Sequence, residues 1–150
     1  AWVPEPVDLT DLAIRAAVEV GLDPHLVASP PAPVVVGGDR GALLRAVRNL
    51  LENAQTHGGG PTAITVSAAA GRGHLAVVDA GPGVPERDRG LIFERFKRGG
   101  ARGDLPGSGL GLSIVAETMR RAGGEVRHAD APGGGSVFTL TFPRAAATDG

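Results

Sequence analysis

Apolar residues recur with helical spacing in two segments of the first half of the chain. In residues 9–20 their period is near 3.6 residues, and Asp8 stands where an N-cap residue is expected. In residues 39–56 the apolar positions fall within an arc of about 120° when successive residues are placed about 100° apart. The pattern predicts two amphipathic helices that pack one face against a common core, the first of them ending at Gly21.

Shorter apolar runs between turn residues predict strands. They are residues 34–36, then 63–69 and 74–78 joined by a turn at 71–73, and finally 125–128 and 137–142 joined around 132–135. A third helix is expected over residues 109–122, because two glycines follow it. Residues 85–96 are expected to form a short helix or two turns, and the glycine-rich residues 97–108 a mobile loop that could act as a lid.

Length, charge and cysteine content restrict the class of protein. A chain of 150 residues is expected to form one domain, and its formal net charge of −1 provides no overall field that would attract nucleic acid or an anionic membrane. The sequence contains no cysteine and no apolar stretch long enough to span a bilayer. We therefore expect a cytoplasmic chain without nucleic-acid or membrane contact, in which any anion site is local.

A glycine-spaced loop follows the predicted strand over residues 74–78. Asp79 stands at the strand end, and Gly81 and Gly83 allow a sharp turn beside it. The carboxylate could accept a hydrogen bond from the exocyclic amine of adenine, with room for the flat base next to the glycines. The alternative is a solvated aspartate in a Gly-Pro-Gly turn, and the loop alone does not decide between the two.

A second glycine-spaced loop leads directly into the third predicted helix. Gly107, Gly109 and Gly111 would let backbone N–H groups and the helix N-terminus face a phosphate without obstruction by side chains. The loop is not the dinucleotide-binding fingerprint, because no strand directly precedes it, and not a Walker loop, because no lysine follows its last glycine. A flexible glycine hinge explains it equally well.

Polar residues recur at every fourth position along the second predicted helix. Asn49, Asn53 and His57 drift only about 40° per step and form a stripe beside the apolar face. The amide oxygen of Asn53 is a hard ligand of the kind that Mg²⁺ accepts, and Asn49 lies one turn earlier. Glu52 is expected to be solvated, and His57 is as compatible with a helix-end position as with a ligand contact.

Four cations lie within eight positions beside Phe93 and Phe96; they are Arg95, Lys97, Arg98 and Arg102. A charge run of this kind is usually a solvated loop, here anchored by two phenylalanines in the core. Beside a bound nucleotide, one of these cations could instead neutralise the terminal phosphate.

Taken together, these segments resemble the N, G1, F and G2 boxes of the ATP-binding catalytic domain of sensor histidine kinases. That domain is part of the superfamily of gyrases, heat-shock chaperones and mismatch-repair ATPases. The resemblance covers about residues 5–143, and residues 93–96 followed by 109–112 look like the kinase branch. It implies an α+β fold, a two-layer α/β sandwich of the Bergerat type in which three helices cover one face of a mixed sheet.

The resemblance also implies roles in a site for ATP and Mg²⁺. Asn53 would hold the metal at the phosphates, and Asp79 would bind the adenine amine. Asn49, near the reacting end, and Arg98, which would approach the γ-phosphate, are the implied catalytic residues. The other implied cofactor-binding residues are His57, Gly81, Gly83, Phe96, Lys97, Gly107, Ser108, Gly109, Leu110, Gly111 and Leu112.

The sequence departs from the family pattern at three positions, two of them shortly after Asn53 and one directly after Asp79. Thr56 stands where Lys or Arg is usual, so one phosphate contact is lost or supplied elsewhere. His57 replaces a frequent aromatic residue, and Ala80 replaces a frequent asparagine. None of these changes removes the metal site or the base site, so nucleotide binding is expected to survive.

The phosphoacceptor is missing from this sequence. Kinases of the family phosphorylate a histidine followed by an acidic residue on a separate helical hairpin, and no histidine here is followed by an acid. We therefore expect residues 8–143 to be the catalytic domain. Residues 1–7 would be a linker from a missing dimerisation and phosphoacceptor domain, and residues 144–150 a disordered tail.

The function implied by the resemblance is transfer of the γ-phosphate of Mg-ATP to a histidine on that hairpin of the same protein. The parent would be a membrane-anchored sensor that acts on a response regulator. Two alternatives stay open: a serine kinase of the anti-sigma-factor type, which is a complete single domain of this size, and a nucleotide-gated interaction module without transfer activity. Gyrase-like hydrolysis fits less well, because those relatives carry a glutamate where Asn49 stands.

Overall fold

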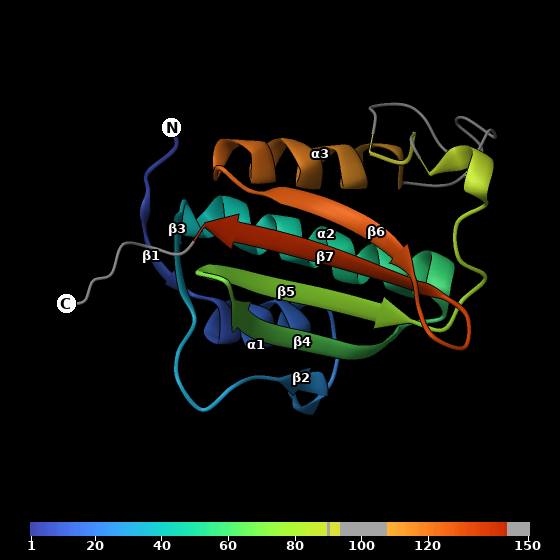
Figure 1. Cartoon of the computed structure of the whole chain (residues 1–150), viewed down its shortest axis with the longest axis horizontal. Helices are drawn as coiled ribbons and strands as arrows, with labels where there is room; N and C mark the ends of the chain where they lie inside the picture. The colour runs from blue at the N-terminus through green and yellow to red at the C-terminus, as the bar shows by residue number, and fades with distance from the viewer. Residues whose placement is uncertain (90, 94–107, 144–150) are drawn as a thin grey trace.

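A five-stranded sheet and three helices form two layers (Figure 1). The computed structural model describes residues 1–89, 91–93 and 108–143. The strand order is β2-β4-β5-β7-β6, and only β2 and β4 run parallel. The strands are β2 (Val27–Ala28), β4 (Pro61–Ala69), β5 (Arg72–Asp79), β6 (Glu125–Asp130) and β7 (Ser136–Pro143). The sheet is therefore mixed, as predicted.

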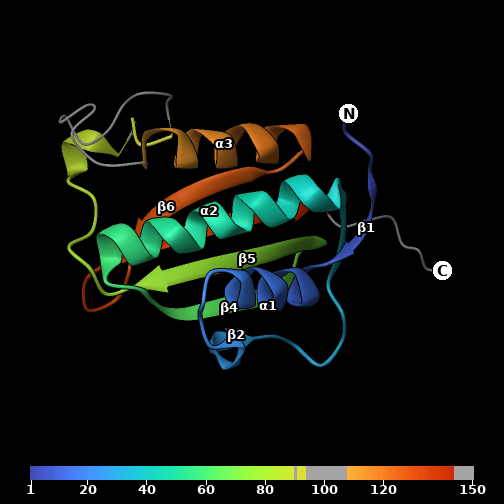
Figure 2. The same cartoon turned by 180° about the vertical axis from the view of Figure 1, so that it is seen from behind.

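The three helices cover one face of this sheet, with α2 between α1 and α3 (Figure 2). They are α1 (Leu9–Glu19), α2 (Arg40–Gly58) and α3 (Ser108–Arg121). The Asp8 carboxylate accepts hydrogen bonds from the first turn of α1, and Asp39 caps α2 in the same way. The predicted helices and the two-layer α+β sandwich are confirmed. Helix α2 extends two residues past the predicted end, because Gly59 adopts the left-handed conformation (φ 74°) that closes it.

The core lies between the helices and the sheet. Alternate residues of β5 and β7 point into it; on β5 they are Gly73, Leu75, Val77 and Asp79, and on β7 Ser136, Phe138, Leu140 and Phe142. The helices contribute the apolar faces read from the sequence, including Leu12, Leu43, Leu50 and Leu51. Because side chains alternate along a strand, the two polar members, Asp79 and Ser136, enter the core together at one end of the sheet.

The N-terminal segment differs from the predicted linker. Residues 5–8 form strand β1 (Glu5–Asp8), which pairs antiparallel with β3 (Val35–Gly38) in a separate two-stranded sheet. The Val3 N–H donates a 2.8 Å hydrogen bond to the carboxylate of Asp39. A strand of four residues that includes a proline carries no alternation in its sequence. It is specified by its partner some 30 residues away, so the pattern of the segment alone could not predict it.

The first residues of the chain also reach α3. The Arg121 guanidinium, at the end of α3, lies 4.6 Å from the centre of the Trp2 ring, in the geometry of a cation–π contact. The N-terminal segment is thus attached to the beginning of α2 and to the end of α3.

The hairpin between β4 and β5 is tighter than predicted. The turn consists of Ala70 and Gly71, both with positive φ (53° and 75°), whereas the sequence suggested residues 71–73. Such two-residue turns match the twist of the flanking strands. Gly73 belongs to β5, where a Cβ would lie 2.8 Å from the side chain of Val36. A glycine is therefore needed at position 73 because the side chain of Val36 packs against the backbone there, and not because the chain turns.

Between β5 and α3 the described chain contains a short 3-10 helix at Glu86–Asp88 and a turn at residues 91–93. They correspond to part of the predicted short helix or two turns. Of the predicted lid over residues 97–108, only Ser108 falls within the described residues, where it begins α3, and the predicted tail over 144–150 falls outside them. No helix in the described part of the chain is long and apolar enough to cross a membrane.

Candidate nucleotide-binding site

Asp79 is a buried carboxylate at the end of β5. Asp79 is 5% exposed, and its Oδ1 atom accepts hydrogen bonds from the backbone N–H groups of Gly81 (2.9 Å) and Ser136 (3.3 Å). Among the described residues, both hydrogen bonds to this carboxylate are accepted by Oδ1. The two N–H donors fix the carboxylate and leave Oδ2 to accept from another group.

Three glycines allow the backbone to close around Asp79. A Cβ on Gly58, at the end of α2, would overlap the Asp79 carboxylate, and a Cβ on Gly135, before β7, would overlap the Asp79 backbone. A Cβ on Gly81 would lie 2.5 Å from the Cα of Gly58. Gly83 has φ 79°, which glycine adopts without strain. Gly81, predicted from the loop pattern, therefore lies beside Asp79 together with Gly58 and Gly135, and Gly83 lies next to Gly135.

The polar stripe of α2 leads to this point. Asn49, Asn53 and His57 are half-buried, while Glu52 is exposed as the helical spacing predicted. His57 directly precedes Gly58, whose Cβ position is occupied by the Asp79 carboxylate, so the stripe runs along α2 toward the helix end that contacts Asp79. The helix thereby brings His57, and Asn53 one turn earlier, to the end of α2 that contacts Asp79, whereas Asn49 lies at the middle of the helix.

Most of the second glycine motif predicted from the sequence belongs to the N-terminus of α3. Ser108, Gly109, Leu110 and Gly111 lie in the first turn of the helix, and the side chain of Leu112 is buried in the core. A helix N-terminus carries unpaired backbone N–H groups and a partial positive charge. The other predicted site residues of this region, Phe96, Lys97, Arg98 and Gly107, lie outside the described residues.

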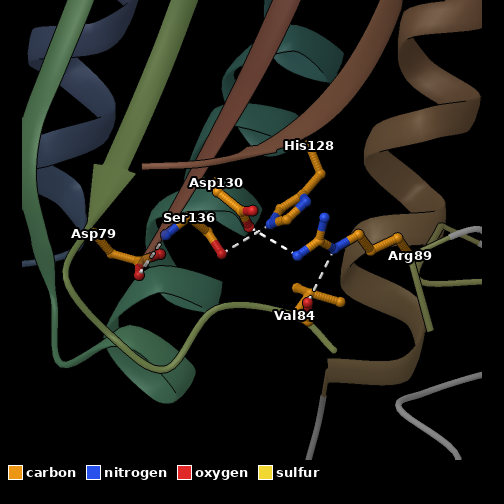
Figure 3. Close-up of polar contacts among 6 residues, drawn as sticks. All are labelled: Asp79, Val84, Arg89, His128, Asp130 and Ser136. Carbon is orange, nitrogen blue, oxygen red and sulfur yellow. Dashed lines mark hydrogen bonds and ion pairs between the residues drawn. The ribbon is translucent and has the colours of Figure 1, made fainter. Parts of the chain in front are cut away.

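A polar network continues from Asp79 to the edge of the sheet (Figure 3). The Nε2 atom of His128, on β6, lies 2.9 Å from the Oγ atom of Ser136. Arg89 donates to the backbone carbonyl of Val84 (3.0 Å) and to the carboxylate of Asp130 (2.9 Å). Burial and the nearby Arg89 lower the pKa of His128, against the opposing effect of Asp130 and Asp79. This lowered pKa favours the neutral form of the ring.

Aromatic packing lies next to this network. The rings of Phe93 and Phe138 meet edge to face with centroids 6.1 Å apart, and the His128 ring lies 5.0 Å from that of Phe138. Phe93 packs against the core, as the sequence suggested. The segment that follows the Asp79 loop is thus held by apolar contacts of Ile92 and Phe93 with the core and by the ion pair of Arg89 with Asp130.

Some residues of the site carry no local sequence signal. Ser136 lies 57 positions from Asp79, and His128 stands in a short strand without a motif. The run of glycines at 133–135 was visible but predicted only a turn. Within residues 1–89, 91–93 and 108–143, no group of three His, Cys, Asp or Glu residues could hold a metal ion.

A mixed five-stranded sheet covered on one face by three helices, with a buried aspartate at the end of a central strand, is the arrangement of a known class of ATPases. A family model described as "Histidine kinase-, DNA gyrase B-, and HSP90-like ATPase" matches residues 38–146, and the chain belongs to this family.

Sensor histidine kinases are among the proteins that this chain resembles over most of its length. The sensor-type histidine kinase PrrB of Mycobacterium tuberculosis is 41% identical over 145 residues, which are 92% of this chain and 32% of PrrB. The solved ATP binding domain of the same PrrB gives a TM-score of 0.73 at 32% identity, covering 95% of this chain and 98% of that one. The mycobacterial sensor histidine kinase MprB gives 0.74 at 35%, with coverage of 95% and 98%. These relatives support the histidine-kinase interpretation and do not favour the serine kinase or the gated module.

Proposed function

We propose that this chain binds Mg-ATP and transfers its γ-phosphate to a histidine on a separate helical hairpin of the same protein. The observation that carries the proposal is the buried Asp79 carboxylate, enclosed by three glycines at the point where the polar stripe of α2 ends. The chain spans about a third of the length of PrrB, so the hairpin would lie in another part of the protein.

The base would bind at Asp79. Because the carboxylate is held through Oδ1, its other oxygen can accept a hydrogen bond from the exocyclic amine of adenine. A guanine base presents a carbonyl at the corresponding position, which a buried carboxylate repels. We therefore propose that the site prefers adenine, with Gly81 and Gly83 shaping the loop beside the base.

The phosphates would extend from the base toward α2 and α3. The Asn53 amide oxygen suits Mg²⁺, which binds through few protein ligands and completes its shell with phosphate and water oxygens. Bound Mg²⁺ would neutralise charge on the phosphates. The first turn of α3, at Ser108 to Gly111, would face them with backbone N–H groups. His57, Phe96, Lys97, Gly107 and Leu112 complete the proposed binding set.

Transfer would depend mainly on positioning. A histidine nitrogen of the hairpin attacks the γ-phosphorus, the bond to the β–γ bridging oxygen breaks, and ADP leaves. Asn49 would lie near the reacting end, and Arg98 would neutralise charge on the γ-phosphate. The chain would be the cytoplasmic part of a membrane-anchored sensor, and the phosphohistidine would supply a response regulator.

Two measurements test this proposal. Calorimetry of the 150-residue chain should detect ATP binding that Mg²⁺ strengthens, and much weaker binding of GTP. Label from γ-labelled ATP should pass to a separately produced hairpin domain in an acid-labile form, as expected for phosphohistidine. Acid-stable label would indicate a serine kinase, and binding without transfer to any hairpin a gated module. Failure to bind ATP would overturn the proposal.

A further inference from the structure

An imidazole occupies an inward-facing position of β6. His128 pairs in register with Phe138 of β7, and paired residues of antiparallel strands point to the same face. Phe138 is buried in the core between sheet and helices, so His128 faces the helix layer as well. A polar ring at such a position costs free energy unless its nitrogens have partners.

One nitrogen of His128 has a partner that leads to Asp79. The Nε2 atom lies 2.9 Å from Ser136 Oγ, and the backbone N–H of the same serine donates to Asp79 Oδ1 at 3.3 Å. Figure 3 shows the serine between the imidazole and the carboxylate. A single residue therefore joins the ring to the proposed base-binding group.

The other nitrogen determines where the proton lies. Nδ1 is buried and has no hydrogen-bond partner among the described residues. A hydrogen on Nδ1 would be a buried donor without an acceptor, whereas a hydrogen on Nε2 can be donated to Ser136 Oγ. The Nε2–H form is therefore favoured, and the serine oxygen acts as its acceptor.

Arg89 holds the loop that follows Asp79 at a second point, Val84. Its guanidinium donates to the Val84 carbonyl, within that loop, and to the Asp130 carboxylate at the end of β6. Strand β6 thus holds the base-binding segment at two points: through Arg89 at the loop and through His128 at Ser136.

We propose that His128 is a positioning residue for the base pocket, which acts through Ser136 to hold the Asp79 carboxylate in the orientation that accepts adenine. The inference rests on the proposed ATP-binding function and deepens it.

The charges around His128 make this role depend on pH. Arg89 faces the ring from the loop, Asp130 from β6 and Asp79 from β5. Burial and Arg89 keep the pKa of His128 below its usual 6.5. Protonation at acid pH would place a hydrogen on the unpartnered Nδ1 and a second cation beside Arg89. The pocket should therefore loosen as the pH falls through the folded-state pKa of His128, which lies below 6.5.

The test is ATP affinity of the 150-residue chain, measured by calorimetry from about pH 5 to about pH 8. His128→Leu should weaken binding about tenfold at pH 7.5, the loss expected for one hydrogen bond. His128→Gln, whose amide can donate from nearly the same place as Nε2, should restore most of the affinity. The affinity of the wild-type chain should fall at acid pH by more than protonation of ATP explains. His128→Gln should not show this additional fall, because its amide does not titrate.

The matched control is His74→Leu. His74 forms a similar pair with the Thr141 hydroxyl (3.2 Å) on the face of the sheet away from the helices, so this variant should bind ATP as the wild-type chain does. Equal affinity of the wild-type chain and a folded His128→Leu would overturn the inference, as would equal pH profiles for the wild-type chain and His128→Gln.

A measurement on the wild-type chain serves if His128→Leu does not fold. Nitrogen chemical shifts of the His128 ring should show the Nε2–H form and should change when ATP binds. An Nδ1–H form of the ring, or nitrogen chemical shifts that do not change when ATP binds, would contradict the positioning role of His128. If the wild-type chain does not bind ATP at all, the proposed function is wrong. If it binds ATP with an affinity that does not depend on His128, only the role of His128 is wrong.

Discussion

Gly58 and Asp79 occupy one space: the carboxylate lies where a side chain on Gly58 would begin. Gly58→Ala therefore forces Asp79 to move, although alanine suits the last turn of a helix better than glycine. We expect nucleotide affinity to fall at least about tenfold, because a displaced carboxylate loses its hydrogen bond to the base. Calorimetry with ATP, together with thermal unfolding, measures the two effects separately.

Gly59→Ala is the matched control for that variant. Gly59 has φ 74°, so alanine is strained there, but no atom lies within 4 Å of the added Cβ. This variant should lower the melting temperature and keep the affinity. If the two variants lose affinity equally, the close approach of Gly58 to Asp79 does not control the pocket.

Asp79→Asn should separate folding from binding. The asparagine oxygen can still accept from the N–H groups of Gly81 and Ser136, so the loop keeps its support. The amide nitrogen then takes the place of Oδ2 and presents a donor to the donor of adenine. Loss of a hydrogen bond to a charged group predicts affinity about tenfold to hundredfold lower. A folded variant with unchanged affinity would rule out the base-binding role.

Asn53→Ala tests the metal assignment. The variant should bind ATP with similar affinity in EDTA and should lose most of the strengthening that Mg²⁺ gives the wild-type chain. Glu52→Ala is the control, since Glu52 is adjacent in sequence but exposed. Full Mg²⁺ dependence in Asn53→Ala would mean that another group holds the cation.

Asp39 should make the stability of the N-terminal segment depend on pH. Hydrogen bonds from the backbone N–H groups of Val3 and Ala42 lower the pKa of Asp39 from its usual 3.8. Because the folded-state pKa is depressed, the stabilisation is present above pH 3.8 and is lost as the pH falls through the lower folded value. Asp39→Asn keeps a capping side chain without the titration. Urea unfolding from about pH 5 to about pH 2.5 should show a smaller decline for this variant, and equal declines would refute the assignment.

The helices were predictable because their signals are local. The apolar period and the capping aspartates at positions 8 and 39 lie within the segments that they specify. Strands β1 and β2 were missed because runs of four and two residues carry no periodic signal, and distant partners hold them in place. The hairpin turn was misplaced because Ala70 adopts positive φ, which sequence rules assign to glycine.

The candidate site could be proposed from the sequence where its residues form a spaced motif. Asp79 with its glycines and the stripe from Asn49 to His57 could be read from the sequence because each lies within one loop or one helix face. Gly58, Ser136 and His128 could not, because their importance comes from which strand and helix ends meet in space. A glycine after a helix predicts only a helix end, whatever it packs against.

The attachment of the N-terminal segment has a practical consequence. Val3 and Trp2 are held at the start of α2 and the end of α3, and Pro143 lies in the same open pocket as Trp2. Asp79 lies at the opposite end of α2, whose 19 residues span about 28 Å. Trp2, Val3 and Pro143 therefore lie at the end of the domain away from Asp79. A sensor chip or a fluorescent tag coupled to the N-terminus would be attached about the length of α2 away from the candidate base-binding residue.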